Sequence, residues 1–159
     1  MRRVSMLFAA AAAVVSITGC GGSSDSITGT NSGVSASFSA SVGGVAWAAV
    51  GPLGLITSTG VTITGGDAGN ATIVTIAFLA SAPGTYSLTF GQTTGGVGTV
   101  AKSGGQAWST VSQGGTGSVT LTTLTAHHAV GTFTFDAIGG ATGLTNVLHV
   151  TNGKFDFTL

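Results

Sequence analysis

The sequence contains very little charge. Only eight of its 159 residues are charged, four Lys or Arg and four acidic residues, so the charged fraction is 5% against roughly 25% in ordinary soluble domains. Every acid is an aspartate, and the absence of glutamate argues against a coiled coil or a charged helical bundle. Because the chain has no basic field to neutralise phosphates, we expect no nucleic-acid partner.

The chain is also short of cysteine and proline. One Cys excludes an internal disulfide, and the two Pro leave 28 Gly, with many Ser and Thr, as the main turn formers. A hydrophobic fraction of 43% with a net charge of zero argues against a wholly disordered chain. The length is that of a single domain.

No apolar run is long enough to cross a bilayer, which needs about 20 residues. The longest run, Val4–Val15, follows the basic pair Arg2-Arg3 and precedes the small-residue stretch Ser16–Gly19. This order is typical of a cleaved secretory signal peptide, so we expect residues 1–19 to be removed.

The end of this segment, Ile17-Thr18-Gly19-Cys20, resembles the lipobox of bacterial lipoproteins. The resemblance implies that the Cys20 sulfur receives a diacylglycerol, that cleavage occurs before Cys20, and that the new amino terminus is acylated. It also implies a lipid-anchored protein of the bacterial cell envelope. Gly21, in place of an aspartate, favours the outer membrane, with the domain on the periplasmic or the cell-surface side. The alternative is a plain signal peptide with an incidental thiol.

Removal of the signal peptide would leave two lysines against four aspartates, a formal charge of −2. Residues 20–33 read as the lipidated Cys followed by a flexible Gly/Ser tether. Residues 34–159 then form one β-domain.

Alternation of apolar and polar residues dominates this domain, as expected of half-buried strands. We expect strands at Val34–Val42, Val45–Val50, Val61–Thr64, Ala71–Leu79, Thr85–Phe90, Ser118–Thr125, His128–Ala137, Val147–Thr151 and Lys154–Leu159. The Gly-rich segment 91–117 adds only the short strand Ala107–Trp108 between mobile loops. About nine strands without a convincing helix predict an all-β, antiparallel sandwich or small barrel.

Two strand assignments are more specific. Ala71–Leu79 is apolar on both faces, which predicts a central strand covered on both sides. Asn152-Gly153 is the preferred type I′ turn, and a hairpin there would pair Val150 with Phe155 and His149 with Asp156.

The inventory of reactive side chains is small. His149 and Asp156 could act as a base and its orienting carboxylate, but the nucleophile and the G-x-S-x-G motif are missing, so we read a solvated pair and assign no catalytic residue. His127 and His128 point to opposite faces of a strand and do not form a metal motif, although one of them with His149 stays an open alternative. We assign no metal and no cofactor.

Three further features have ordinary explanations. The cluster around Asp67 has one carboxylate, too few for calcium, and reads as a turn. The T-x-T pairs, Thr62/Thr64, Thr120/Thr122, Thr123/Thr125 and Thr132/Thr134, suggest an ice-binding face but are irregularly spaced. Trp108 is the aromatic residue expected to be exposed, and with His128, His149 and Asp156 it forms our set of candidate surface contacts.

From Phe38 to Leu159 the chain resembles small β-rich bacterial lipoproteins of a domain-of-unknown-function type. The residues that carry the resemblance are 42–47, 84–88, 131–135 and 151–157. It implies an envelope lipoprotein without an assigned activity and supplies no catalytic residue.

Together these observations predict a non-enzymatic, lipid-anchored envelope protein whose β-domain binds a ligand or has a structural role. Its expected partners are the membrane, through Cys20, and an envelope protein or a glycan. The alternatives are an envelope hydrolase or glycan-active enzyme with an unrecognised site, and a small outer-membrane β-barrel.

Overall fold

A computed structural model describes residues 36–69, 71–89, 91–92, 95–139 and 146–159. The predicted signal peptide, the lipidation site Cys20 and the tether lie outside the described residues. Within the described ranges no helix is long and apolar enough to span a membrane. The described strands belong to one compact unit, Asn31–Leu159.

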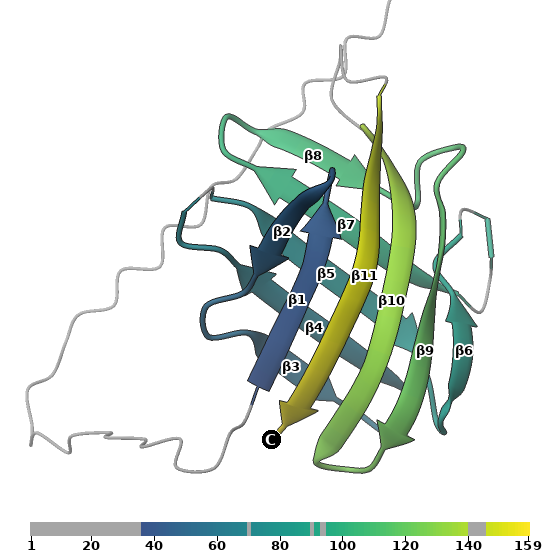
Figure 1. Cartoon of the computed structure of the whole chain (residues 1–159). Coiled ribbons are helices and arrows are strands. Elements are labelled where there is room, and N and C mark those ends of the chain that lie inside the picture. The colour runs from purple at the N-terminus through teal and green to yellow at the C-terminus, as the bar shows by residue number, and fades with distance from the viewer. Residues whose placement is uncertain (1–35, 70, 90, 93–94, 140–145) are drawn as a thin grey trace, which may run out of the picture. The chain divides into compact units, whose positions relative to one another are not determined.

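The domain is all-β, as predicted, and its strands form one antiparallel sheet (Figure 1). The strands are β1 (Ala36–Val42), β2 (Val45–Ala48), β3 (Leu53–Ile56), β4 (Gly60–Gly66), β5 (Ile73–Leu79), β6 (Gly84–Ser87), β7 (Gly96–Lys102), β8 (Gln106–Ser109), β9 (Thr116–Leu124), β10 (His128–Gly139) and β11 (Val147–Thr158).

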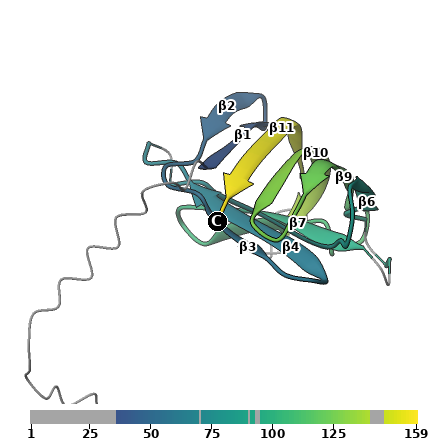
Figure 2. The same cartoon turned by 90° about the horizontal axis from the view of Figure 1, so that it is seen from below.

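The sheet folds over itself into two layers (Figure 2). One layer runs β2-β1-β11-β10-β9-β6, and the other runs β3-β4-β5-β7-β8. The two are joined where Ile138 and Gly139 of β10 pair with Ser109 and Trp108 of β8. The sheet does not close on itself, so the sandwich is the correct one of the two predicted architectures.

Aromatic side chains fill the space between the layers. Phe133, Phe135, Phe155 and Phe157 all point inward, as their positions in the alternating pattern predicted, and each is at most 4% exposed. The ring of Trp47 meets another buried ring, that of Phe38, edge-on at a centroid distance of 5.2 Å. The predicted core role of Trp47 is therefore confirmed.

Glycines make room for these rings. A Cβ atom at Gly98 would lie 2.8 Å from Cδ1 of Phe135, and one at Gly54 would lie 2.5 Å from Cε1 of Phe157. Both distances are shorter than van der Waals contact, so no larger residue fits without displacing a buried ring. Part of the high glycine content therefore serves packing between the layers.

Two strands, β3 and β7, were missed at the sequence level. β7 lies inside its layer, between β5 and β8, where loops were expected. Gly96 and Gly98 occupy two of its inward positions, and the side chains that cover them come from other strands. The apolar alternation that identifies a strand is therefore absent from its own sequence.

The predicted hairpin at Asn152-Gly153 is wrong, because β11 continues through it. The register with β10 passes from Phe133 opposite Gly153 to Phe135 opposite Val150, which leaves one extra residue in β11. Asn152 has the positive φ, 54°, expected of the turn. A β-bulge uses that conformation without reversing the chain. Its extra residue also shifts the inward-pointing apolar residues of the strand from even-numbered to odd-numbered positions.

The prediction for the segment Ala71–Leu79 is correct in part. β5 is central, since it pairs with β4 on one side and β7 on the other. Its outer face, however, is open: Ile73 is 49% exposed and Leu79 is 54% exposed. Cover on both faces is thus not provided by the described part of the chain.

Candidate functional site

The structure pairs His149 with a different aspartate from the one expected and gives Asp156 to His128 instead. His149 Nδ1 lies 2.7 Å from Asp136 Oδ1, and His128 Nε2 lies 2.8 Å from Asp156 Oδ1, both across the β10–β11 ladder. The predicted pair His149–Asp156 is wrong. In a continuous strand the seven intervening steps separate these two residues by about 23 Å.

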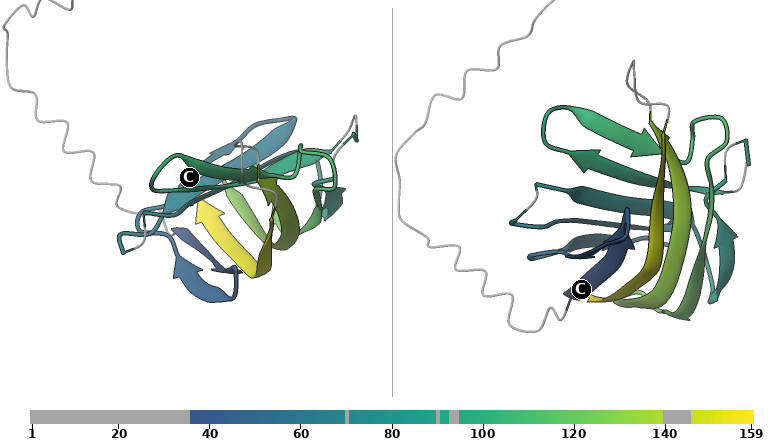
Figure 3. Two further views of the ribbon diagram at one scale, coloured as in Figure 1. Left: turned by 90° about the horizontal axis from the view of Figure 1, so that it is seen from above. Right: turned by 45° about the horizontal axis from the view of Figure 1, so that its top comes forward.

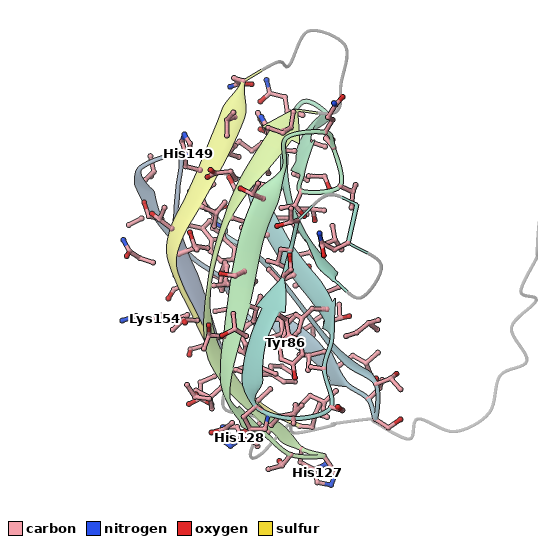
Figure 4. All side chains as sticks on the ribbon, turned by 90° about the vertical axis from the view of Figure 1, so that its right-hand side faces the viewer. Tyr86, His127, His128, His149 and Lys154 are labelled. Carbon is pink, nitrogen blue, oxygen red and sulfur yellow. The ribbon has the colours of Figure 1, made fainter. Side chains whose placement is uncertain are left out.

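Both pairs are exposed to solvent, and Figure 4 shows the two histidines at the outside of the sandwich. Their side chains are between 38% and 65% exposed. Among the described residues no hydroxyl group is hydrogen-bonded to either imidazole, and no group of three His, Cys, Asp or Glu could hold a metal ion. The geometry is that of solvated cross-strand pairs, while a contact role for His128, His149 and Asp156 stays a prediction.

Trp108 is not the exposed contact that was predicted. It is 4% exposed, because the ring of this β8 residue points into the sandwich, and its Nε1 donates to Asn146 Oδ1 at 3.4 Å. The ammonium group of Lys102 lies 5.6 Å from the ring centroid. The buried indole therefore packs against the ammonium group of Lys102 and is not exposed to a binding partner.

The threonine pairs are divided between the two outer faces of the sandwich. We call the outer surface of the β1-β11-β10-β9-β6 layer the hydroxyl face and define it by Ser37, Ser39, Ser41, Thr85, Ser87, Ser118, Thr120, Thr132, Thr134, Thr151, Lys154 and Asp156. Several of these hydroxyls already bond within the protein, as Thr85 does with Thr120 at 3.1 Å. Ice binding by such a face stays a prediction.

The strongest candidate site is a cavity at one end of the sandwich, which we call the end pocket. Its volume is about 270 Å³. It lies between the β1–β2 turn, the β4–β5 connection and the β7–β8 turn (Figure 1). The lining residues are Val42, Val45, Ala46, Trp47, Asp67, Thr72, Lys102, Ser103 and Gln106.

Three hydrogen bonds to the backbone of Asp67 and Thr72 hold the acidic side of the pocket. Thr72 N donates to Asp67 Oδ1 at 2.9 Å, and Asp67 N donates to Thr72 O at 3.0 Å. Trp47 Nε1 donates to the same carbonyl oxygen at 3.1 Å. These bonds tie the edge strand β2 to the β4–β5 connection, and they confirm the turn role predicted for Asp67.

The β7–β8 turn forms the opposite side. Lys102 and Gln106 pair across this turn, and Ser103 lies between them in the chain. The side chain of Lys102 is half-buried against Trp108. An ammonium donor and an amide thus share one cavity with a carboxylate acceptor.

Sequence reasoning missed this site because its residues come from three separate turns. Asp67 follows β4 and Lys102 ends β7, each next to a Gly-rich turn where a polar residue is ordinary. The scarcity of charge could have drawn attention to these two residues. Only eight charged residues occur in the chain, and two of opposite sign line this cavity.

Comparison with known proteins places the domain in a family. No curated protein and no solved structure matches the chain. A family model described as a domain of unknown function, DUF6252, matches residues 34–157, which is nearly the whole β-domain predicted from the sequence. The chain therefore belongs to the DUF6252 family.

Proposed function

We propose that this protein is a lipid-anchored protein of the bacterial cell envelope whose β-sandwich binds a small polar ligand in the end pocket without converting it. The observation that carries the binding role is the placement of Asp67 and Lys102 in one cavity of a chain with 5% charge. The anchor rests on the lipobox-like segment Ile17-Thr18-Gly19-Cys20.

The composition of the pocket favours a neutral ligand rich in hydroxyl groups, such as the end unit of a glycan. A hydroxyl can donate to the Asp67 carboxylate and accept from the Lys102 ammonium, and the Gln106 amide can do both. Val45 and Ala46 add an apolar wall for the ring carbons. The cavity of about 270 Å³ is at the small end of ligand pockets, so it suits a monosaccharide unit better than a long segment.

The binding role can be tested by NMR titration of the mature chain carrying Cys20→Ser with glucose, galactose and N-acetylglucosamine. We expect shifts confined to the pocket residues for at least one sugar, and loss of these shifts in Lys102→Met, which keeps the stem on Trp108. Lys154→Met on the hydroxyl face is the matched control. The absence of any pocket shift with all three sugars would contradict the proposed ligand class, and conversion of a sugar would favour the envelope-enzyme alternative.

The anchor requires a separate test. Cells that express the protein and are fed a radiolabelled fatty acid should yield a labelled band, and the band should be absent for Cys20→Ser. Since Cys20 is the single cysteine, an unlabelled wild-type band would refute the anchor.

A further inference from the structure

One outer face of the sandwich differs in chemistry from the other. We call the outer surface of the β3-β4-β5-β7-β8 layer the neutral face, because its outward positions carry no charged residue among those the structure describes. These residues are Leu53, Leu55, Thr62, Thr64, Ile73, Thr75, Ala77, Leu79, Val97, Thr99, Ala101, Ala107 and Ser109. The hydroxyl face, by contrast, carries Lys154 and Asp156, and Asp136 lies beside it.

Large apolar side chains on the neutral face are unusually exposed. Leu53 is 70% exposed, Leu55 59%, Leu79 54% and Ile73 49%. A depression of about 450 Å³ between Leu55 and Leu79 adds a hollow to the same surface. Single exposed apolar residues are common, but a group on one face marks a surface that contacts another body.

The sequence of β5 also indicates that this face contacts another body. Its apolar residues on both faces are typical of a strand that is covered on both sides. The inner face packs in the core through Val74, Ile76 and Phe78, whereas the described part of the chain leaves the outer face open. The outer face of β5 is therefore available for contact with another body.

The polar groups of the neutral face can be desolvated at low cost. The hydroxyls of Thr64 and Thr75 bond to each other at 2.8 Å, so part of their hydrogen-bonding capacity is used within the sheet. No charge has to be desolvated, which removes the largest cost of contact with an apolar phase.

The chain enters the domain across from β3, the edge strand of the layer that carries this face. β1 begins at Ala36, which pairs with Phe157, and the ring of Phe157 packs on Gly54 of β3. Figure 3 (right) shows the start of β1 beside the C-terminal end of β11. Residues 21–35 separate Ala36 from the proposed anchor and can span at most about 50 Å when extended.

We propose that the neutral face lies on the lipid surface of the membrane that holds the acylated Cys20, with Leu53, Leu55 and Leu79 in the interfacial region. This inference rests on the anchor of the proposed function. A short covalent link keeps the domain near the bilayer, and apolar side chains then enter the boundary between headgroups and acyl chains. The arrangement directs the hydroxyl face away from the membrane.

The test uses the lipidated full chain in vesicles of phosphatidylethanolamine and phosphatidylglycerol. Since the sulfur of Cys20 is acylated, Leu55→Cys introduces the single free thiol, which can carry a nitroxide. Thr132→Cys, an exposed residue of the hydroxyl face, is the matched control. Collision rates with a charged nickel chelate and with oxygen then report whether each label contacts lipid.

We expect the label at position 55 to collide about tenfold less often with the chelate than the label at position 132, because a charged complex is excluded from the apolar phase. Adding Leu53→Asp and Leu79→Asp should raise the chelate collisions at position 55 to the control level. Equal collision rates at positions 55 and 132 would overturn the proposal.

Two controls separate the alternatives. Flotation of the vesicles shows whether the protein is anchored at all, so a failed anchor appears as protein left at the bottom of the gradient and not as an accessible label on floated protein. Shielding of position 55 that persists for the protein in detergent, together with spin–spin broadening, would overturn the lipid contact in favour of a second copy of this chain.

Discussion

At the scale of single residues, one buried hydroxyl shows how the two inner strands are held together. Thr110 is fully buried and accepts a hydrogen bond from Gly98 N at 3.1 Å, while its own N donates to Gly98 O at 3.0 Å. The side chain thus completes the backbone pairing just past the end of β8, where a regular ladder bond is missing.

We predict that Thr110→Val destabilises the domain by about 1–3 kcal/mol, because it leaves the buried N–H of Gly98 without an acceptor. Thr99→Val, on the neutral face one residue further along β7, should change the free energy of unfolding by less than about 0.5 kcal/mol. Urea unfolding measures both. Similar stabilities for the two variants would contradict the role given to the Thr110 hydroxyl.

A second prediction concerns the glycines beneath the aromatic rings. Gly98→Ala would bring a methyl group to within 2.8 Å of Phe135 and should cost about 1–3 kcal/mol through overpacking. Gly69→Ala is the control, since a Cβ atom there meets nothing within 4 Å. Thermal unfolding should separate the two variants clearly, and an unchanged midpoint for Gly98→Ala would show that the ring is free to move.

At the scale of elements, the bulge in β11 determines which side chains of this strand point into the core and which residues of β10 they meet. Without it, side chains at even-numbered and odd-numbered positions of one strand would point to opposite faces. With it, the even-numbered Leu148 and Val150 and the odd-numbered Phe155 and Phe157 all point into the core. It also separates His149 from Asp156 and places each beside a residue of β10.

The bulge predicts different effects on stability for two substitutions at one position. Asn152→Val should lose about 1–2 kcal/mol of stability, because a β-branched residue is strained at a φ of 54°. Asn152→Gly should stay within about 0.5 kcal/mol of the wild type, since glycine adopts this conformation freely. Equal urea midpoints for the two variants would argue against the left-handed residue in β11.

The new pairing of the histidines is testable by double-mutant cycles. His149→Gln combined with Asp136→Asn should show a coupling of about 0.2–1 kcal/mol, the range for exposed cross-strand pairs. The cycle between His149→Gln and Asp156→Asn should show no coupling, because the two residues lie far apart on one strand. Coupling in the second cycle alone would restore the hairpin.

At the scale of the whole molecule, the first and last strands of the domain are neighbours. β11 pairs with β1 on one side and β10 on the other, so the chain completes its sheet only when its C-terminal residues are in place. Such pairing between distant segments is costly to form before the rest of the sheet exists.

A chain that ends at Gly153 should therefore lose cooperative unfolding. It lacks Phe155 and Phe157, it leaves the start of β1 without a partner strand, and it leaves the start of β10 paired only with β9. Removal of Leu159 alone should cost at most about 1 kcal/mol, the value of its one backbone hydrogen bond to His127 O. Near-ultraviolet circular dichroism during urea unfolding distinguishes the two. A cooperative transition in the shorter chain would show that β11 is dispensable.

Much of the fold was predictable because the signals are local. Alternation in Ala36–Val42 and His128–Gly139 identifies strands without any knowledge of their partners. The positive φ at Asn152 was likewise predictable, since asparagine before glycine favours that conformation in any context. The missed strand β7 shows the limit of this reasoning, because its inward glycines derive their packing from Phe78 and Phe135 elsewhere in the chain.

The sequence by itself therefore determined the all-β class, the inward aromatics and the scarcity of charge, because each depends on residues close together in the chain. The proposed acylation of Cys20 likewise rests on a local segment of the sequence. Only the tertiary structure decided whether Asn152 makes a turn or a bulge, which aspartate each histidine meets, and that Trp108 is buried. It alone brought Asp67 and Lys102 into one pocket and left the outer face of β5 uncovered. These outcomes depend on contacts between distant segments, and no local pattern encodes such contacts.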